Sequence, residues 1–287
     1  MLLAQLTDLI GRTAPLRLIS EAAGAAAEGT HEAAHELPNL LTVVTHFMAE
    51  GPAKAFIEQW ESMIFAFAIA GLLILVAQLA VRNPQMIPGR LQNVVEMAVE
   101  SLTNFIMGVL GPQGKPYVPF LGSLFIYILA MNLAGTLPFG KSPTSSLNTT
   151  LSLALCVFVY VHYIGFTKHG VLGYLKHMAG SPTNTVEWVL APLMFVIHVI
   201  GELSRPVSLS LRLFGNVSGE DVLLFAFCSL GVTALSALHS PVGIPLQTPF
   251  ILLAFLTSFI QALVFMLLST VYILLWLPHD DHAEGHH

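Results

Sequence analysis

Charged side chains are scarce in this sequence of 287 residues. They make up 10% of it, against roughly 25% in an ordinary soluble domain, while 55% of the residues are apolar. A chain with so little charge cannot enclose all of its apolar surface in one water-soluble core. The composition therefore predicts an integral membrane protein, whose solvent is a lipid membrane.

Cysteine and clusters of basic residues are also rare. Cys156 and Cys228 are isolated within apolar runs and form no CxxC motif, so they are expected to act as small buried apolar residues. The net charge of −6 arises largely in the first 61 residues, which contain eight acids and three bases. With no basic patch, the sequence does not predict nucleic-acid binding.

Motifs for catalytic chemistry are absent. The sequence has no P-loop, so any nucleotide chemistry must belong to partner subunits. The nearest approach to the zinc motif H-E-x-x-H is the segment from His198 to Glu202, which lacks a second histidine. Residues 279–287 contain four histidines, and a solvated tail explains them more simply than a metal site does. We therefore expect no enzymatic activity of the chain on its own, no metal and no cofactor.

Five apolar runs are long enough to cross a membrane, which takes about 20 apolar residues. They cover 62–81, 117–138, 147–166, 186–238 and 249–277. The run 90–110 differs, because Glu96 and Glu100 share one side and apolar residues the other, so it predicts an amphipathic interfacial helix. The stretch 167–185 is expected to be a polar loop and 240–248 a turn. The predicted fold class is an all-α integral membrane protein with about five membrane helices.

Three regions follow from this division. Residues 1–59 are expected to be solvated and partly mobile, 60–278 to form the membrane domain, and 279–287 to form a histidine-rich cytoplasmic tail. If the run 186–238 crosses once and the N-terminus is outside, five basic residues near the spans fall inside and two outside, which fits the positive-inside rule. If that run crossed the membrane twice, the last helix would have the opposite orientation in the membrane.

An arginine, Arg212, lies in the middle of the fourth apolar run. Burying an arginine in a membrane costs between roughly 2.5 and more than 10 kcal/mol, depending on the method. The guanidinium cannot escape this cost by losing its proton. No acid lies three or four residues away along the helix, so we expect the counter-charge of Arg212 to come from elsewhere.

Polar residues near Arg212 fall mostly on one side of a helical wheel. At about 100° per residue, six of them project within roughly 80° of Arg212; they are His198, Glu202, Arg205, Ser208, Asn216 and Glu220. Asp221 projects to the opposite side. Such a stripe is typical of an ion path, although single polar residues in membranes often only join helices. Arg205 is expected to snorkel toward the interface.

The segment from Arg205 to Asn216 reads RPVSLSLRLFGN and resembles the signature of subunit a of the F-type ATP synthase, bacterial or plastid branch. Three further segments resemble the same family in the same order. They are LQNVVEMAVE from position 91, MNL with LP within 131–138, and QALVFMLLSTVY from position 261.

The resemblance implies a mechanism. Arg212 corresponds to the family's essential arginine, which faces a ring of c subunits that each carry a membrane carboxylate. Two offset aqueous half-channels reach the ring from opposite sides, and the arginine attracts the deprotonated carboxylate and keeps the half-channels apart. Asn216 and Gln261 correspond to helper positions. The last two membrane helices are long and tilted in this family.

The same resemblance implies partners and a location. The partners are the c-subunit ring, b-type peripheral stalk subunits, the F1 sector through the complex, and the lipid membrane. The location is the bacterial cell inner membrane, as a multi-pass protein with its N-terminus outside and its C-terminus in the cytoplasm. The resemblance does not decide between protons and sodium ions.

Two positions depart from the family pattern. The spacing from Arg212 favours Asp221 as the channel acid, whereas the helical wheel and the preceding glycine favour Glu220, so both remain candidates. An acid that the family can carry fourteen residues before the arginine is His198 here, and Glu202 is the alternative one helical turn later. The competing interpretation of the whole chain is a secondary ion-coupled transporter or channel, but the interrupted segment has no paired repeat.

Overall fold

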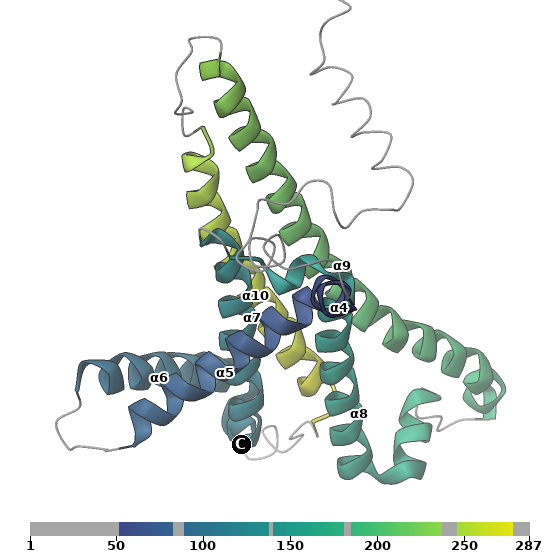
Figure 1. Ribbon diagram of the computed structural model, residues 1–287. Coiled ribbons are helices and arrows are strands. Elements are labelled where there is room, and N and C mark those ends of the chain that lie inside the picture. Colours follow the sequence, from purple (N-terminus) through teal and green to yellow (C-terminus); the bar gives the residue numbers. More distant parts are fainter. Residues whose placement is uncertain (1–51, 83–88, 138–139, 181–184, 237–245, 278–287) are drawn as a thin grey trace, which may run out of the picture. The chain divides into compact units, whose positions relative to one another are not determined.

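The computed structural model describes residues 52–82, 89–137, 140–180, 185–236 and 246–277, and these residues contain helices and no strand (Figure 1). The α-helices are α4 (Pro52–Gln59), α5 (Glu61–Val81), α6 (Arg90–Leu110), α7 (Val118–Thr136), α8 (Leu147–Met178), α9 (Thr185–Ser236) and α10 (Thr248–Leu274). Two 3₁₀ helices, η1 (Gly111–Tyr117) and η2 (Pro143–Ser145), precede α7 and α8.

Five helical segments are long and apolar enough to cross a membrane, which confirms the predicted fold class. They are Glu61–Val81, Gln92–Thr136, Leu147–Lys176, Val189–Gly231 and Thr248–Leu274. Lipid forms no hydrogen bonds with the backbone. A spanning segment therefore becomes a helix, in which its N–H and C=O groups bond to each other. The amphipathic helix α6 has the bounds expected of it, with Glu96 and Glu100 exposed and Ile106 and Leu110 buried.

The prediction of a polar loop over 167–185 was wrong for much of its length. Helix α8 continues past Phe166 to a kink at Gly170, where φ is +66°, and then on to Met178. After the kink, Lys176 is exposed, whereas Tyr174 is buried and stacks on Phe166 with ring centroids 4.2 Å apart. The lysines and histidines of this stretch had made the segment look like a loop.

Helix α9 is one continuous helix of 52 residues. At 1.5 Å per residue it extends about 78 Å, far more than the roughly 30 Å of a hydrocarbon core. It passes through Pro192 and Pro206 without ending. The run 186–238 therefore crosses a membrane once rather than twice, and its length predicts a strong tilt.

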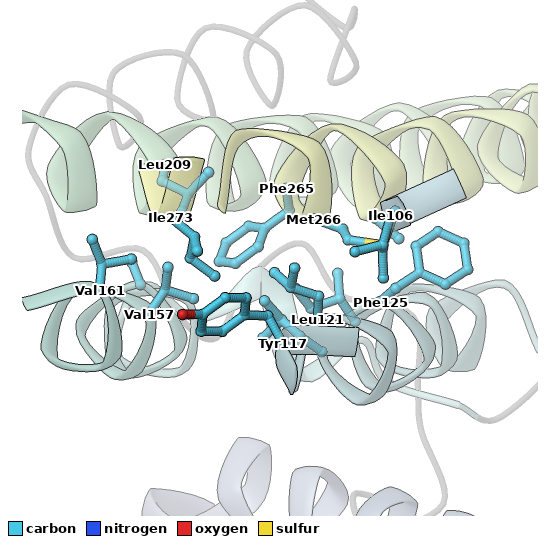
Figure 2. Packing of buried hydrophobic residues seen from close by; sticks show 14 of the residues in the cluster. Ile106, Tyr117, Leu121, Phe125, Val157, Val161, Leu209, Phe265, Met266 and Ile273 are labelled. Atoms are coloured by element: carbon cyan, nitrogen blue, oxygen red, sulfur yellow. The ribbon is translucent and has the colours of Figure 1, made fainter. Parts of the chain in front are cut away.

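The buried core lies between α7, α8 and α10, with α6 and α9 contributing from their inner faces (Figure 2). Helix α10 buries residues at helical spacing, among them Ala254, Ser258, Ala262, Phe265 and Ile273. Several are small, and small residues let membrane helices approach closely. This packing fixes the inner face of α9 and leaves its other face free.

Contacts between helix ends show which ends share a side of the membrane domain. The first residue of α5, Glu61, pairs with Lys141 after α7, and Ser218 of α9 bonds to Ser145 of η2. On the other side, His169 near the kink of α8 contacts the backbone oxygen of Trp276 after α10, at 3.2 Å. The C-terminal part of α9 thus lies on the side where α5 begins.

Candidate ion-translocation site

Arg212 lies on the exposed face of α9, on the wall of a shallow open hollow that Leu203, Ser204, Ser208 and Leu211 also line. Within the part of the chain that the structure describes, it makes no ion pair or hydrogen bond. The three residues that anchor this stretch of α9, Leu209, Leu213 and Val217, are buried in the core. Their packing fixes the backbone of α9 at this point. The guanidinium of Arg212 therefore points away from the core.

Asn216, one helical turn after Arg212, connects α9 to α10. Its side-chain Nδ2 donates a hydrogen bond of 2.7 Å to Oε1 of Gln261. Gln261 is only 4% exposed, and its Nε2 is buried without a hydrogen-bond partner among the described residues. A buried amide N–H that lacks a protein partner is an expected position for a water molecule. The two helper positions of the resemblance are thus in direct contact.

A row of buried hydroxyl and amide groups continues from this pair along α7 and η2. Thr144 donates a hydrogen bond of 2.6 Å to Oδ1 of Asn132 and shares another of 2.7 Å with Ser142. Asn132 in turn contacts the backbone oxygen of Ser258, which lies one helical turn before Gln261. We call Ser142, Thr144, Asn132, Ser258 and Gln261 the buried polar row.

The two candidate channel acids lie on the same side of the membrane domain as this row. Glu220 and Asp221 are both half-buried, although the wheel had placed only Glu220 on the side of α9 that carries Arg212. The nearby Ser218 donates a hydrogen bond of 3.3 Å to the backbone oxygen of Ser145, next to the row. The geometry therefore keeps both acids as candidates.

An ion pair lies at the same end of the molecule. Nζ of Lys141 is 3.2 Å from Oε2 of Glu61, and both side chains are mostly buried. The other oxygen of Glu61 is buried without a hydrogen bond among the described residues. Lys141 directly precedes Ser142, so the charged pair is next to the first member of the buried polar row.

On the other side of Arg212, Glu202 and Arg205 form a close pair. Arg205 Nη1 is 2.6 Å from Glu202 Oε1, and the guanidinium lies over the ring of Tyr272 at 5.0 Å. Arg205 therefore turns to a carboxylate on its own helix, which the snorkelling expectation did not foresee. His198 is exposed and bonds at 3.0 Å to the backbone oxygen of Met194 on its own helix.

Sequence reasoning missed several of these groups. Glu61, Lys141, Ser142, Thr144 and Ser258 had not been candidates, yet they are buried or mostly buried polar groups on one side of Arg212. The concentration of Ser, Thr and Pro at 142–146, directly before an apolar run, was the available signal. The described residues contain no group of three or more His, Cys, Asp or Glu that could hold a metal ion.

Comparison with known proteins decides the family. The family model described as "ATP synthase A chain" matches residues 62–274, which is most of the chain and includes every candidate residue above. The chain belongs to the ATP synthase A chain family. The similarity extends over most of the chain and not only over the arginine segment, as three relatives show.

One relative in the ATP synthase A chain family is ATP synthase subunit a of Protochlamydia amoebophila. It is 51% identical over 250 residues, which cover 87% of this chain and 91% of that protein. ATP synthase subunit a 3 of Pelobacter propionicus is 41% identical over 213 residues, covering 74% and 86%. ATP synthase subunit a of Geotalea daltonii is 39% identical over 226 residues, covering 79% and 89%. The chain is accordingly a multi-pass, non-catalytic membrane subunit of an ATP synthase.

Proposed function

We propose that this chain is the stationary proton-conducting subunit of the Fo sector and that Arg212 meets the carboxylates of a rotating c ring. The observation that carries the proposal is the position of Arg212, exposed on a free helix face without a partner in the described part of the chain. A permanent cation in a membrane needs a counter-charge. A carboxylate on a moving partner supplies one that can arrive and leave.

The outer route is assigned to the side that holds the buried polar row. Asn216, Gln261, Glu220 and Asp221 would carry protons between the outer aqueous phase and the ring. The hydrogen bond between Asn216 and Gln261, and the unpartnered Nε2 of Gln261, support a hydrated path there. The Glu61–Lys141 ion pair lies on the same side.

The inner route is assigned to the opposite end of the exposed face of α9, near His198 and Glu202. His198 is exposed on this face, and Glu202 lies within the bundle one turn later. Arg212 then lies between the two routes along α9. Its charge blocks a direct passage for protons, because a proton approaching a fixed cation is repelled.

This assignment sets the orientation and the partners. The N-terminus faces the outside of the bacterial inner membrane and the C-terminal tail faces the cytoplasm, which keeps most basic residues near the spans inside. The partners are the c ring, b-type peripheral stalk subunits and, through the complex, the F1 sector. The competing interpretation as a secondary transporter has no support from the family, which is that of an ATP synthase chain.

Replacing Arg212 tests the proposal. Each proton that crosses 100 mV releases about 2.3 kcal/mol, which drives synthesis only if the proton travels with the ring. Arg212→Ala is expected to abolish proton-driven ATP synthesis and to permit passive proton leakage, while the complex still assembles. Arg212→Lys is expected to be severely impaired, because an ammonium lacks the planar guanidinium fork and can lose its proton when desolvated.

The assays are ATP synthesis and proton pumping in inverted membrane vesicles, with the abundance of the complex measured by immunoblot. Lys168→Ala is the matched control, since Lys168 is an exposed cation on another helix, α8. Near-normal synthesis by an assembled Arg212→Ala complex would refute the proposed function.

A further inference from the structure

Two arginines, Arg205 and Arg212, lie seven residues apart on α9. At 100° and 1.5 Å per residue they project within about 20° of each other and are separated by about 10.5 Å along the helix. Position on the helix alone would thus present both cations to the same partner. Their side chains nevertheless behave differently.

Arg212 is exposed, whereas Arg205 is turned toward the bundle. The side chain of Arg205 is 28% exposed and that of Glu202 only 10%, and the two groups are 2.6 Å apart. Tyr272 of α10 covers the guanidinium from its ring face at 5.0 Å. The carboxylate of Glu202, on the same helix, and the ring of Tyr272, on α10, therefore both lie against this cation.

A small, partly open cavity lies beside the pair. It has room for about one water molecule and is lined mainly by apolar groups of α8 and α9, together with His162 and Tyr272. This space is too small to solvate a guanidinium that has left Glu202. We therefore expect an unpaired Arg205 to turn outward, toward the exposed face of α9.

We propose that Glu202 is a positioning residue that neutralises Arg205 and withdraws it from the exposed face of α9, so that Arg212 is the single cation that this stretch of α9 offers to the rotor. This inference rests on the proposed function, because it takes that face to be the one that meets the ring. A second free cation about 10.5 Å along the helix would hold a passing carboxylate after Arg212 had released it. Glu202 acts here through Arg205, which is separate from any contact of Glu202 with protons.

Neutralising the pair one residue at a time tests this inference. Glu202→Gln alone frees Arg205 and should lower ATP synthesis by roughly tenfold, a coupling in the range found for contacting residues. The double variant Glu202→Gln/Arg205→Met removes both charges and keeps an unbranched apolar side chain against Tyr272. Its synthesis rate should be clearly higher than that of Glu202→Gln, by the part of the loss that the freed Arg205 causes. Glu202→Gln/Arg205→Lys is the matched control, which keeps the cation and should stay impaired.

The outcomes separate this inference from the proposed function. If the neutral double variant assembles but is as impaired as Glu202→Gln, then Glu202 acts on protons and not through Arg205, and the inference is overturned while the role of Arg212 stands. A Glu202→Gln complex with unchanged synthesis overturns it as well. Loss of assembly in the neutral double variant also overturns it, because the pair would then serve stability alone. Failure of the proposed function would appear separately, as continued synthesis by Arg212→Ala.

Discussion

Asn216 on α9 and Gln261 on α10 are joined by a hydrogen bond of 2.7 Å, one helical turn beyond the exposed Arg212. The bond ties the free face of α9 to the buried polar row behind it. Gln261 still has a buried N–H without a partner among the described residues, so the pair is both a structural contact and a place for water. Four predictions follow from this arrangement and from the groups around it.

Gln261→Leu should lower proton pumping strongly, because Asn216 would lose its acceptor and the row would lose its last amide. The exchange Asn216→Gln/Gln261→Asn keeps the combined length of the two side chains and should retain more pumping than Gln261→Leu. Pumping is measured by quenching of a pH-sensitive dye in inverted vesicles. An exchange variant no better than Gln261→Leu would argue against a direct role for this bond.

The two half-buried acids of α9 should share the outer route. Glu220→Gln and Asp221→Asn are each expected to reduce proton-driven synthesis, and the double variant to reduce it further than either. The measurement is the synthesis rate per assembled complex. Glu96→Gln is the control, since Glu96 is an exposed acid on α6. Wild-type synthesis by the double variant would exclude both acids from the route.

Residues of the buried polar row should be reachable by water although they are buried in the chain. In a background without Cys156 and Cys228, Thr144→Cys and Ser258→Cys are expected to react with a small aqueous thiol reagent applied from the outer side. Ala154→Cys, in the apolar core on α8, should be protected. The readout is mass spectrometry of the labelled chain. Equal protection at all three positions would show that the row is dry.

The exposed face of α9 should be covered in the assembled complex. Exposed apolar residues and an arginine without an intramolecular partner in the described part of the chain are costly to leave against lipid. An affinity-tagged chain extracted in mild detergent is expected to co-purify with a small c-type hairpin subunit and a b-type stalk subunit. Purification of the tagged chain as a stable, partner-free monomer would contradict the rotary assignment.

The membrane helices could be predicted because lipid leaves little choice. Apolar runs of about 20 residues must become helices, so five spans and the bounds of α6 followed from composition alone. The part of α8 after Gly170 was not predicted, because it is not a long apolar run. Its lysine, Lys176, suggested a polar loop. The burial of Tyr174 depends on packing against Phe166, which is close only in the folded chain.

The site was predictable where its residues share one helix and not where they meet across helices. The lack of a local acid near Arg212 already indicated an outside partner, and the structure places this arginine on a free face. The contact of Thr144 with Asn132 joins two elements, so no periodicity within one segment reveals it. The wheel also treated α9 as isolated. The spacing of three residues allows Glu202 and Arg205 to pair, but a wheel could not show that the pair would lie against Tyr272 of α10.

The apolar side chains of Leu209, Leu213 and Val217 give α9 mechanical support next to Arg212. These three side chains lie at successive turns on the packed side of α9 and flank Arg212 on both sides along the helix axis. Any sideways force that a turning rotor exerts on the guanidinium is therefore transmitted to close-packed apolar contacts, which resist compression. In the proposed function this chain is the stator, which must deform less than the rotor that moves past it. Cavities made at Leu213 would soften this support, and torque would be lost as elastic bending of α9 even though Arg212 and its charge remained in place.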